Sequence, residues 1–175
     1  MRIDTVETKV YPFDELSDEA KQAAIENLYD INVDYAWYEP TYDDAEVIGL
    51  VITEFDANHC DGQWTEDAED VAKLIIENHG EDCETRKDAE EFIVQVGRAQ
   101  AIFEAMRVPP YDSSYHEFDE SDEYEELCEE FLAAICEDYS IILQKAYEYL
   151  STEEAIIETI KANEYEFTEA GKLYC

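Results

Sequence analysis

Two long segments of this chain carry many carboxylates and no Lys or Arg to neutralise them. Residues 22–72 contain 14 Asp and Glu and residues 108–144 contain 12, so these segments hold 26 of the 47 acidic side chains. Unpaired carboxylates belong in water rather than in a core. Any fold of this chain must therefore hold acidic faces outward by burying the apolar side chains between them.

The overall charge narrows the classes of partner. The chain has 11 Lys and Arg against 47 Asp and Glu, a formal net charge of −36. A protein that binds nucleic acid directly needs a basic surface, so this class is excluded, and binding to anionic membranes is disfavoured. Of these classes of partner, a basic protein is the one that the charge favours. Because 46% of the residues are hydrophobic and 13% aromatic, we expect a folded chain rather than a disordered one.

The sequence favours a cytoplasmic location. The opening residues MRIDTVETKV contain no apolar signal region, and no segment approaches the roughly 18 apolar residues that cross a bilayer. The five cysteines form an odd set without the dense spacing of a disulfide-stapled protein. We expect free thiols in a reducing compartment.

The spacing of apolar residues and the positions of helix-capping and turn residues predict a mainly helical α+β fold with five to six helices. Ser17 is typical of a helix N-cap, and Gly49 of a left-handed C-cap. A small antiparallel sheet is expected from an N-terminal strand, a central hairpin and a C-terminal hairpin. The predicted helices are 18–35, 41–48, 65–78, 85–106, 119–150 and 152–162, and the strands 3–11, 50–55, 63–65, 165–167 and 172–175.

The length of 175 residues indicates a single acidic domain, 1–175. Pro109 and Pro110 mark the clearest loop, which allows two sub-lobes, 1–106 and 115–175, joined by residues 107–114.

The predicted helix over 119–150 concentrates charge on one side. Its apolar positions are expected to share the opposite side: Tyr124, Leu127, Phe131, Ile135 and Ile142. Eight acids fall within 119–130, one for every ~2 Å of helix axis, and duplex DNA presents one charge per ~1.7 Å. The candidate phosphate-mimicking residues are Asp119, Glu120, Asp122, Glu123, Glu125, Glu126, Glu129, Glu130 and Glu137, with Asp43, Asp44 and Glu46 from the earlier segment.

Two simpler readings of the acidity stay open. The carboxylates could form a solvated surface without a partner, or the chain could be adapted to high salt. Helices rich in Glu usually interleave Lys at four-residue spacing, because unpaired like charges there cost a few tenths of a kcal/mol each. Both acidic segments of this chain lack such Lys residues, so the repulsion between their carboxylates is not relieved.

Catalytic and metal motifs are weak. No glycine-rich phosphate loop, G-x-S-x-G or H-E-x-x-H is present, so we expect no cofactor and no enzyme. The segment 56–67 resembles a calcium loop, but its fifth ligand position holds Cys60 and its glycine arrives one place late. A weak zinc candidate combines four side chains of suitable type: His59, Cys60, His79 and Cys83.

Both ends of the chain carry a resemblance. Residues 13–25, FDELSDEAKQAAI, resemble an F-x-E-L-S-x-E-A-K-x-x-A-I opening found in small acidic phage and prophage proteins, and EYEFT at 164–168 followed by Gly171 resembles their closing hairpin. The resemblance implies a phage context without a mechanism. In size, acidity and lack of catalytic motifs, the chain is also similar to DNA-mimic inhibitors of restriction and CRISPR systems.

These observations lead to one main expectation and two alternatives. We expect a phage-type counter-defence inhibitor that mimics DNA and blocks the basic nucleic-acid channel of a host nuclease, restriction enzyme or CRISPR effector, acting alone or as a homodimer. The first alternative is an antitoxin-like or adaptor protein that binds one basic partner. The second is a small hydrolase that depends on carboxylates or zinc.

Overall fold

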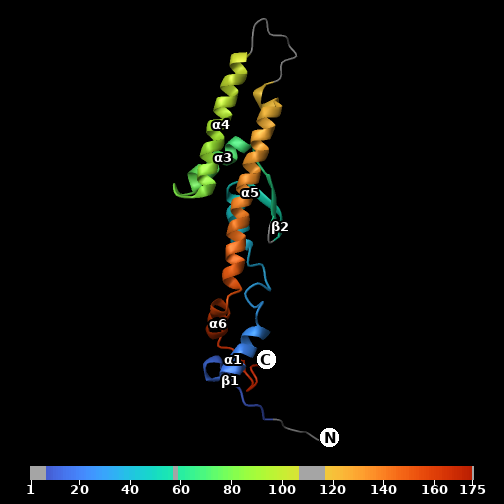
Figure 1. Ribbon diagram of the computed structural model, residues 1–175, viewed down its shortest axis with the longest axis vertical. Helices are drawn as coiled ribbons and strands as arrows, with labels where there is room; N and C mark the ends of the chain where they lie inside the picture. Colours follow the sequence, from blue (N-terminus) through green and yellow to red (C-terminus); the bar gives the residue numbers. More distant parts are fainter. Residues whose placement is uncertain (1–6, 57–58, 107–116, 175) are drawn as a thin grey trace. The chain divides into compact units, whose positions relative to one another are not determined.

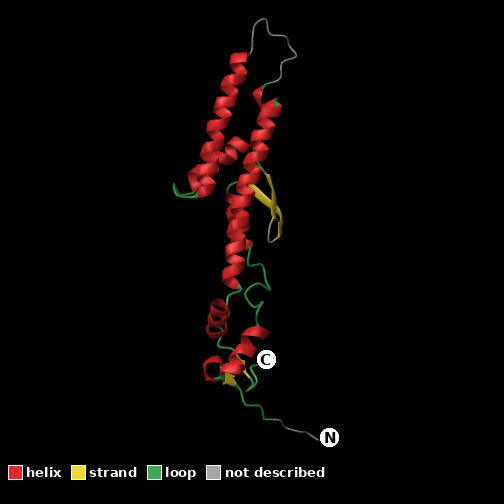
Figure 2. Cartoon of the chain, viewed as in Figure 1, coloured by secondary structure: helices red, strands yellow, loops and turns green. Residues whose placement is uncertain are grey.

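The computed structural model describes residues 7–56, 59–106 and 117–174. Their contacts group into two compact units. Unit 1 comprises residues 1–37 and 145–175, and unit 2 comprises residues 38–144 (Figure 1). Helices dominate both units, beside two short pairs of strands (Figure 2). No helix among the described residues has the length and apolar character that a bilayer span requires.

Unit 1 joins segments from far apart in the sequence. Strand β1 (Tyr11–Pro12) pairs antiparallel with β4 (Glu166–Phe167), and α1 (Asp18–Asn27) contacts α6 (Glu153–Ala162). A short 3₁₀ turn, η1 (Phe13–Glu15), follows β1. The prediction that strands near the two ends of the sequence pair is confirmed. The core consists of Phe13, Leu16, Ala20, Ala24, Ile25, Ile156, Ile160 and Phe167.

Side-chain caps fix where the unit 1 helices begin. The Ser17 hydroxyl accepts the Ala20 N–H at 3.2 Å, as predicted for the start of α1. Thr152 caps α6 in the same way. Helix α1 ends at Asn27, eight residues before its predicted end. Turns replace it because buried Asn32 donates to the Leu150 carbonyl at 3.0 Å and accepts from Thr159 at 2.6 Å.

Unit 2 combines a hairpin with four helical segments. Helix α2 (Glu39–Val47) leads into β2 (Leu50–Asp56), which pairs antiparallel with β3 (His59–Trp64). Gly49 separates α2 from β2 with a φ of +83°, as expected for its C-cap role. Two helices follow, α3 (Ala68–Asn78) and α4 (Glu84–Met106). The turn η2 (Phe118–Glu120) then precedes α5 (Asp122–Leu150), whose residues up to Gln144 belong to this unit.

Stacked aromatic rings hold unit 2 together. The Phe92 and Phe131 rings lie 4.3 Å apart and nearly parallel, and the Trp64 ring lies 5.3 Å from Phe131. These three side chains join α4, α5 and β3. Beyond them, Phe103 of α4 makes an edge contact with Phe118.

The observed division corrects the predicted sub-lobes. A boundary within 107–114 would separate α4 from α5, but ring stacking and edge contacts place these helices in one unit. The loop itself lies outside the described residues. The strands that the structure describes also form two separate two-stranded sheets, β1–β4 and β2–β3, rather than one, because each pair belongs to a different unit. Most of the predicted strand 3–11 is likewise outside the described residues.

Two glycines provide a matched test of unit 1 packing. Gly171 has a φ of +76°, and a Cβ there would overlap the Ala20 carbonyl, whereas a Cβ at Gly97 on α4 would meet no atom within 4 Å. We predict that Gly171→Ala destabilises unit 1 by more than about 1 kcal/mol, whereas Gly97→Ala stabilises its helix by about 1 kcal/mol. Urea unfolding followed by circular dichroism measures both. Shifts of the same sign in the two variants would contradict the packing described here.

Candidate functional site

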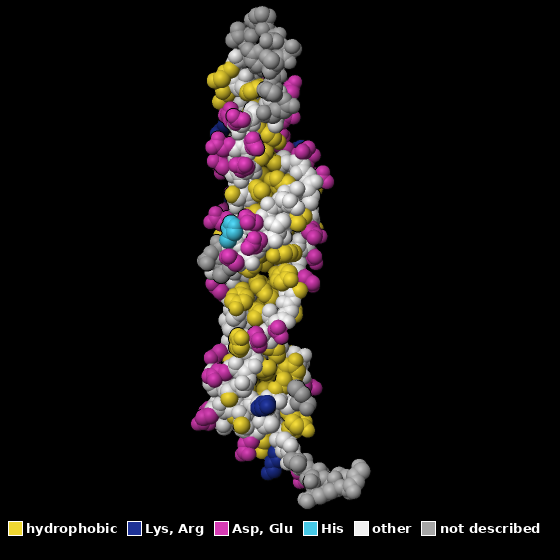
Figure 3. All heavy atoms as spheres, turned by 90° about the vertical axis from the view of Figure 1, so that its right-hand side faces the viewer, with side chains coloured by type: hydrophobic (Ala, Val, Ile, Leu, Met, Phe, Trp, Pro, Cys, Tyr) yellow, Lys and Arg dark blue, Asp and Glu magenta, His cyan; other side chains and the backbone are white. Residues whose placement is uncertain are grey.

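Seven carboxylates of α5 form the surface that we call the acidic face. All seven are exposed, and none makes an ion pair with a described Lys, Arg or His. Asp and Glu are the main charged side chains on the face of the molecule shown in Figure 3. The acidic face consists of Asp122, Glu123, Glu125, Glu126, Glu129, Glu130 and Glu137.

The opposite side of α5 fixes the orientation of the acidic face. Phe131, Ile135, Tyr139 and Leu143 are buried, so the helix cannot rotate without exposing them. Ile142, predicted to lie with them, is 43% exposed because the buried positions pass through Tyr139 and Leu143 instead. At the N-terminus, the Ser121 hydroxyl accepts the Tyr124 N–H at 3.2 Å. The carboxylates of the first turn also interact favourably with the helix dipole.

The remaining predicted acids occupy different environments. Asp119 is exposed in η2, and the side chain of Glu120 is outside the described part of the chain. Asp43 and Glu46 are exposed on α2. Asp44 differs, because one of its oxygens accepts the buried Tyr139 hydroxyl at 2.8 Å and lies 4.0 Å from His79 Nε2. Asp44 is exposed, yet it is bonded to a buried side chain, a role that the sequence did not indicate.

A cavity of about 410 Å³ lies between β3 and α5. Two residues of the acidic face, Glu129 and Glu137, line it, and Cys60 and Cys136 do so as well. Helix α5 lies so close to β3 that a Cβ at Gly62 would come within 3.1 Å of Cys136 Sγ. The complete lining is His59, Cys60, Asp61, Gly62, Glu129, Leu132, Ala133, Cys136, Glu137 and Ser140.

Cys60 and Cys136 are buried thiols that interact with each other. The hydrogen bond from Cys136 lowers the pKa of Cys60. The same hydrogen bond, together with burial, raises the pKa of Cys136. A negative charge on this pair would therefore reside on Cys60.

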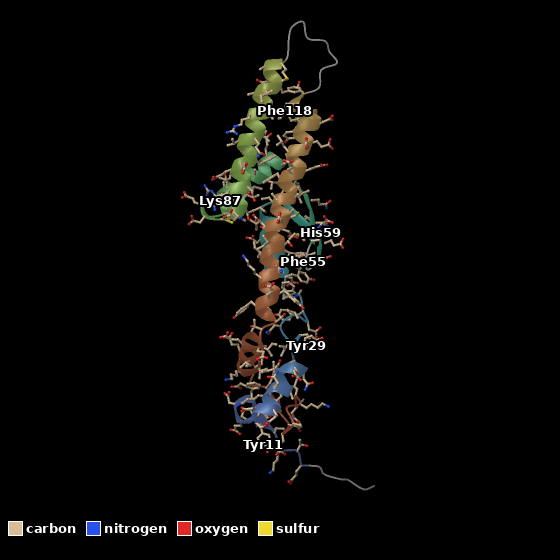
Figure 4. The ribbon with its side chains drawn as sticks, viewed as in Figure 1. Tyr11, Tyr29, Phe55, His59, Lys87 and Phe118 are labelled. Atoms are coloured by element: carbon tan, nitrogen blue, oxygen red, sulfur yellow. The ribbon has the colours of Figure 1, made fainter. Side chains whose placement is uncertain are left out.

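The predicted four-residue zinc site is not formed. His59 Nε2 lies 3.0 Å from Asp61, and Cys60 pairs with Cys136. His59 is exposed and Cys60 is buried, because successive side chains of a strand point to opposite faces. Among the described residues, no three His, Cys, Asp or Glu side chains are placed to hold one metal ion. Figure 4 shows His59 on one side of α5 and Lys87, in the first turn of α4, on the other side.

The other two residues of the predicted zinc site, His79 and Cys83, do contact each other. His79, at the end of α3, has Nδ1 3.6 Å from the sulfur of Cys83, which immediately precedes α4. Its other ring nitrogen faces Asp44 at 4.0 Å. The imidazole thus lies between a thiol and a carboxylate. One metal ion could not be bound by all three side chains, because the two ring nitrogens point in different directions.

Asp138 is an unsatisfied acid beside this cluster. Its Oδ2 atom is buried and has no hydrogen-bond partner among the described residues. Burial raises the pKa of Asp138, a hydrogen bond from Thr85 lowers it, and the charges of Glu84 and Glu137 raise it further. The net effect is a raised pKa, so the charged form is disfavoured in the folded state.

Comparison of the chain with models of protein families, with curated proteins and with solved structures finds no match.

The raised pKa of Asp138 predicts a pH-dependent stability. The folded state holds the Asp138 proton more tightly than the unfolded state, so the contribution of Asp138 to stability falls as the pH rises through its folded pKa. We predict that Asp138→Asn is more stable than the wild type at pH 7, and that this advantage shrinks toward pH 4. Urea unfolding at intervals of half a pH unit measures it.

Glu130→Gln is the control for this prediction, because Glu130 is an exposed carboxylate of the same helix. Its effect should stay within about 0.5 kcal/mol at every pH. An Asp138→Asn advantage that does not change between pH 4 and pH 7 would be inconsistent with the raised pKa.

Proposed function

We propose that this chain is a counter-defence inhibitor of the phage type, which mimics nucleic acid and occupies the basic channel of a host nuclease, restriction enzyme or CRISPR effector. The observation that carries the proposal is the acidic face, a set of exposed carboxylates on one helix with no described base to pair with them. Its ligands would be Arg and Lys side chains, which form strong charge-assisted hydrogen bonds with carboxylates as they do with phosphates.

The spacing of the acidic face supports this proposal. Six of its carboxylates lie between Asp122 and Glu130. At 1.5 Å per residue these positions span about 12 Å, or about 2 Å of helix axis per charge. Duplex DNA carries one charge per ~1.7 Å. A channel that matches the linear charge density of a duplex would therefore meet a similar density here.

The rigidity of the acidic face supports it as well. Its helix is held by buried Phe131, Ile135 and Tyr139, so the carboxylate positions are set before any partner arrives. A preorganised surface loses less conformational entropy on binding than a mobile acidic tail. The stability lost to charge repulsion along the face then has a functional explanation.

Unit 1 offers an observation in favour of the adaptor alternative. Five of its described tyrosines are exposed: Tyr29, Tyr35, Tyr147, Tyr149 and Tyr174. Tyrosine is enriched at protein interfaces, where its ring packs and its hydroxyl stays hydrated. An adaptor would bind a basic partner through such a mixed surface without excluding nucleic acid from it.

Displacement of DNA separates these two functions. A fluorescent 30-base-pair duplex is bound to each of a panel of purified bacterial restriction enzymes and guide-loaded CRISPR nucleases, and the chain is added at low salt. We predict that it displaces the duplex from at least one enzyme, with an affinity that falls steeply as the salt concentration rises. Replacing Glu125, Glu126, Glu129 and Glu130 by Gln should weaken displacement at least ~10-fold, because each lost charge contact contributes up to about 1 kcal/mol.

A second quadruple variant controls for net charge. Glu26, Glu154, Glu158 and Glu169 of unit 1 are exposed, and their replacement by Gln changes the charge by the same amount. We expect this variant to displace DNA as the wild type does. Equal weakening by both variants would indicate a general charge effect, and binding that leaves the duplex in place would favour the adaptor.

A further inference from the structure

Three ionisable side chains meet in unit 2, apart from the acidic face: Asp44, and His79 and Cys83, which are four positions apart. Cys83 Sγ lies 3.6 Å from His79 Nδ1, and His79 Nε2 lies 4.0 Å from Asp44. Asp44 comes from α2, His79 from the end of α3, and Cys83 from the residue before α4. A thiol, an imidazole and a carboxylate in this order can activate the thiol as a nucleophile, because the imidazole takes its proton and the carboxylate orients the imidazole.

Neighbouring contacts hold each member of this cluster in place. The buried Tyr139 hydroxyl donates to the Asp44 carboxylate at 2.8 Å. Arg86 Nη1 donates to the His79 carbonyl at 3.1 Å, and the Cys83 N–H donates to the Gly80 carbonyl at 3.0 Å. The His79 side chain is only 12% exposed, so its ring is confined between its two partners.

Charged groups from α2, α4 and α5 surround the cluster. Asp44 from α2 lies 4.0 Å from His79 Nε2, and the nearby His79 lowers the pKa of Asp138 from α5, which partly offsets the effect of burial. Cys83 immediately precedes the first turn of the 23-residue helix α4, and the free amides at a helix N-terminus interact favourably with negative charge. The other charged or titratable groups near the cluster include Asp82, Glu84, Arg86 and Lys87 at or just before the start of α4, and Tyr139 from α5.

Exposure distinguishes Cys83 from Cys60 and Cys136, and the adjacent imidazole distinguishes it from Cys128, which is also partly exposed. Cys83 is partly exposed, whereas Cys60 and Cys136 are buried against each other. Burial raises the pKa of Cys128, which outweighs the effect of its hydrogen bond with Tyr124. Cys83 is therefore the described thiol that combines access from solvent with an adjacent base.

We propose that Cys83 is a nucleophilic thiol that accepts acyl groups from activated carbonyl compounds, esters or thioesters, with His79 as its base and Asp44 as a positioning residue. The Cys83 proton passes to His79 Nδ1, and the sulfur attacks the carbonyl carbon. A carbon–sulfur bond forms, the bond from that carbon to the leaving oxygen or sulfur breaks, and the leaving group takes the proton from His79. The product is a thioester on Cys83.

Acetylation by 4-nitrophenyl acetate tests this proposal in the intact chain. Release of 4-nitrophenolate gives the rate, and peptide mass spectrometry gives the site. We expect one acetyl group at Cys83, formed at least ten times faster than at Cys128 in the same molecules. This internal comparison needs no variant, and equal rates at the two cysteines would overturn the proposal.

Variants assign the roles of the two partners. His79→Gln should slow acetylation of Cys83 at least 10-fold at pH 7, but much less at alkaline pH, where hydroxide can take the proton in place of the imidazole. Asp44→Asn can still accept the Tyr139 hydroxyl, and it should move the rise of the rate to higher pH, which loss of packing alone would not do. A pH profile unchanged in both variants would overturn the assignment of His79 and Asp44.

Discussion

The buried side of α5 is the constraint on which the rest of unit 2 depends. The chain places its largest concentration of negative charge on this helix, and repulsion within it opposes folding. Phe131, which stacks on Phe92 and contacts the tilted ring of Trp64, supplies the opposing contacts together with Ile135 and Tyr139. The same packing fixes which carboxylates face water. Stability and the pattern of surface charge are therefore consequences of one set of contacts.

Much of the fold was predictable, because local signals agree with the final structure. The Ser17 cap, the left-handed Gly49 and the pairing of strands near the chain ends all follow from residue types and spacing. The prediction failed where distant residues decide the conformation. Asn32 ends the regular structure after α1 through bonds to Leu150 and Thr159, more than 100 positions away. The assignment of α4 and α5 to one unit likewise depends on ring contacts that periodicity does not reveal.

The candidate sites also include features that local sequence signals predict and features that depend on distant residues. Helical periodicity places the acidic residues on one exposed face of α5, as the sequence predicts. His79 and Cys83 were predicted to bind zinc from their residue types. Metal ligands must converge on one point, and among the described residues these side chains do not do so with others. Asp44 could not be assigned, because its bond to Tyr139 joins residues 95 positions apart. In the sequence, Asp44 is one acid among 47.

The pairing of β1 with β4 has a consequence for the order of events during synthesis. Unit 2 is complete once Gln144 has left the ribosome, whereas unit 1 needs both its early segment and residues beyond 165. Domains generally fold as units while the chain emerges. Residues 7–37 then lack three of the eight core side chains of unit 1 until α6 and β4 are synthesised. Unit 2 is in effect an insertion in unit 1, and its early folding shortens the effective loop that unit 1 must close.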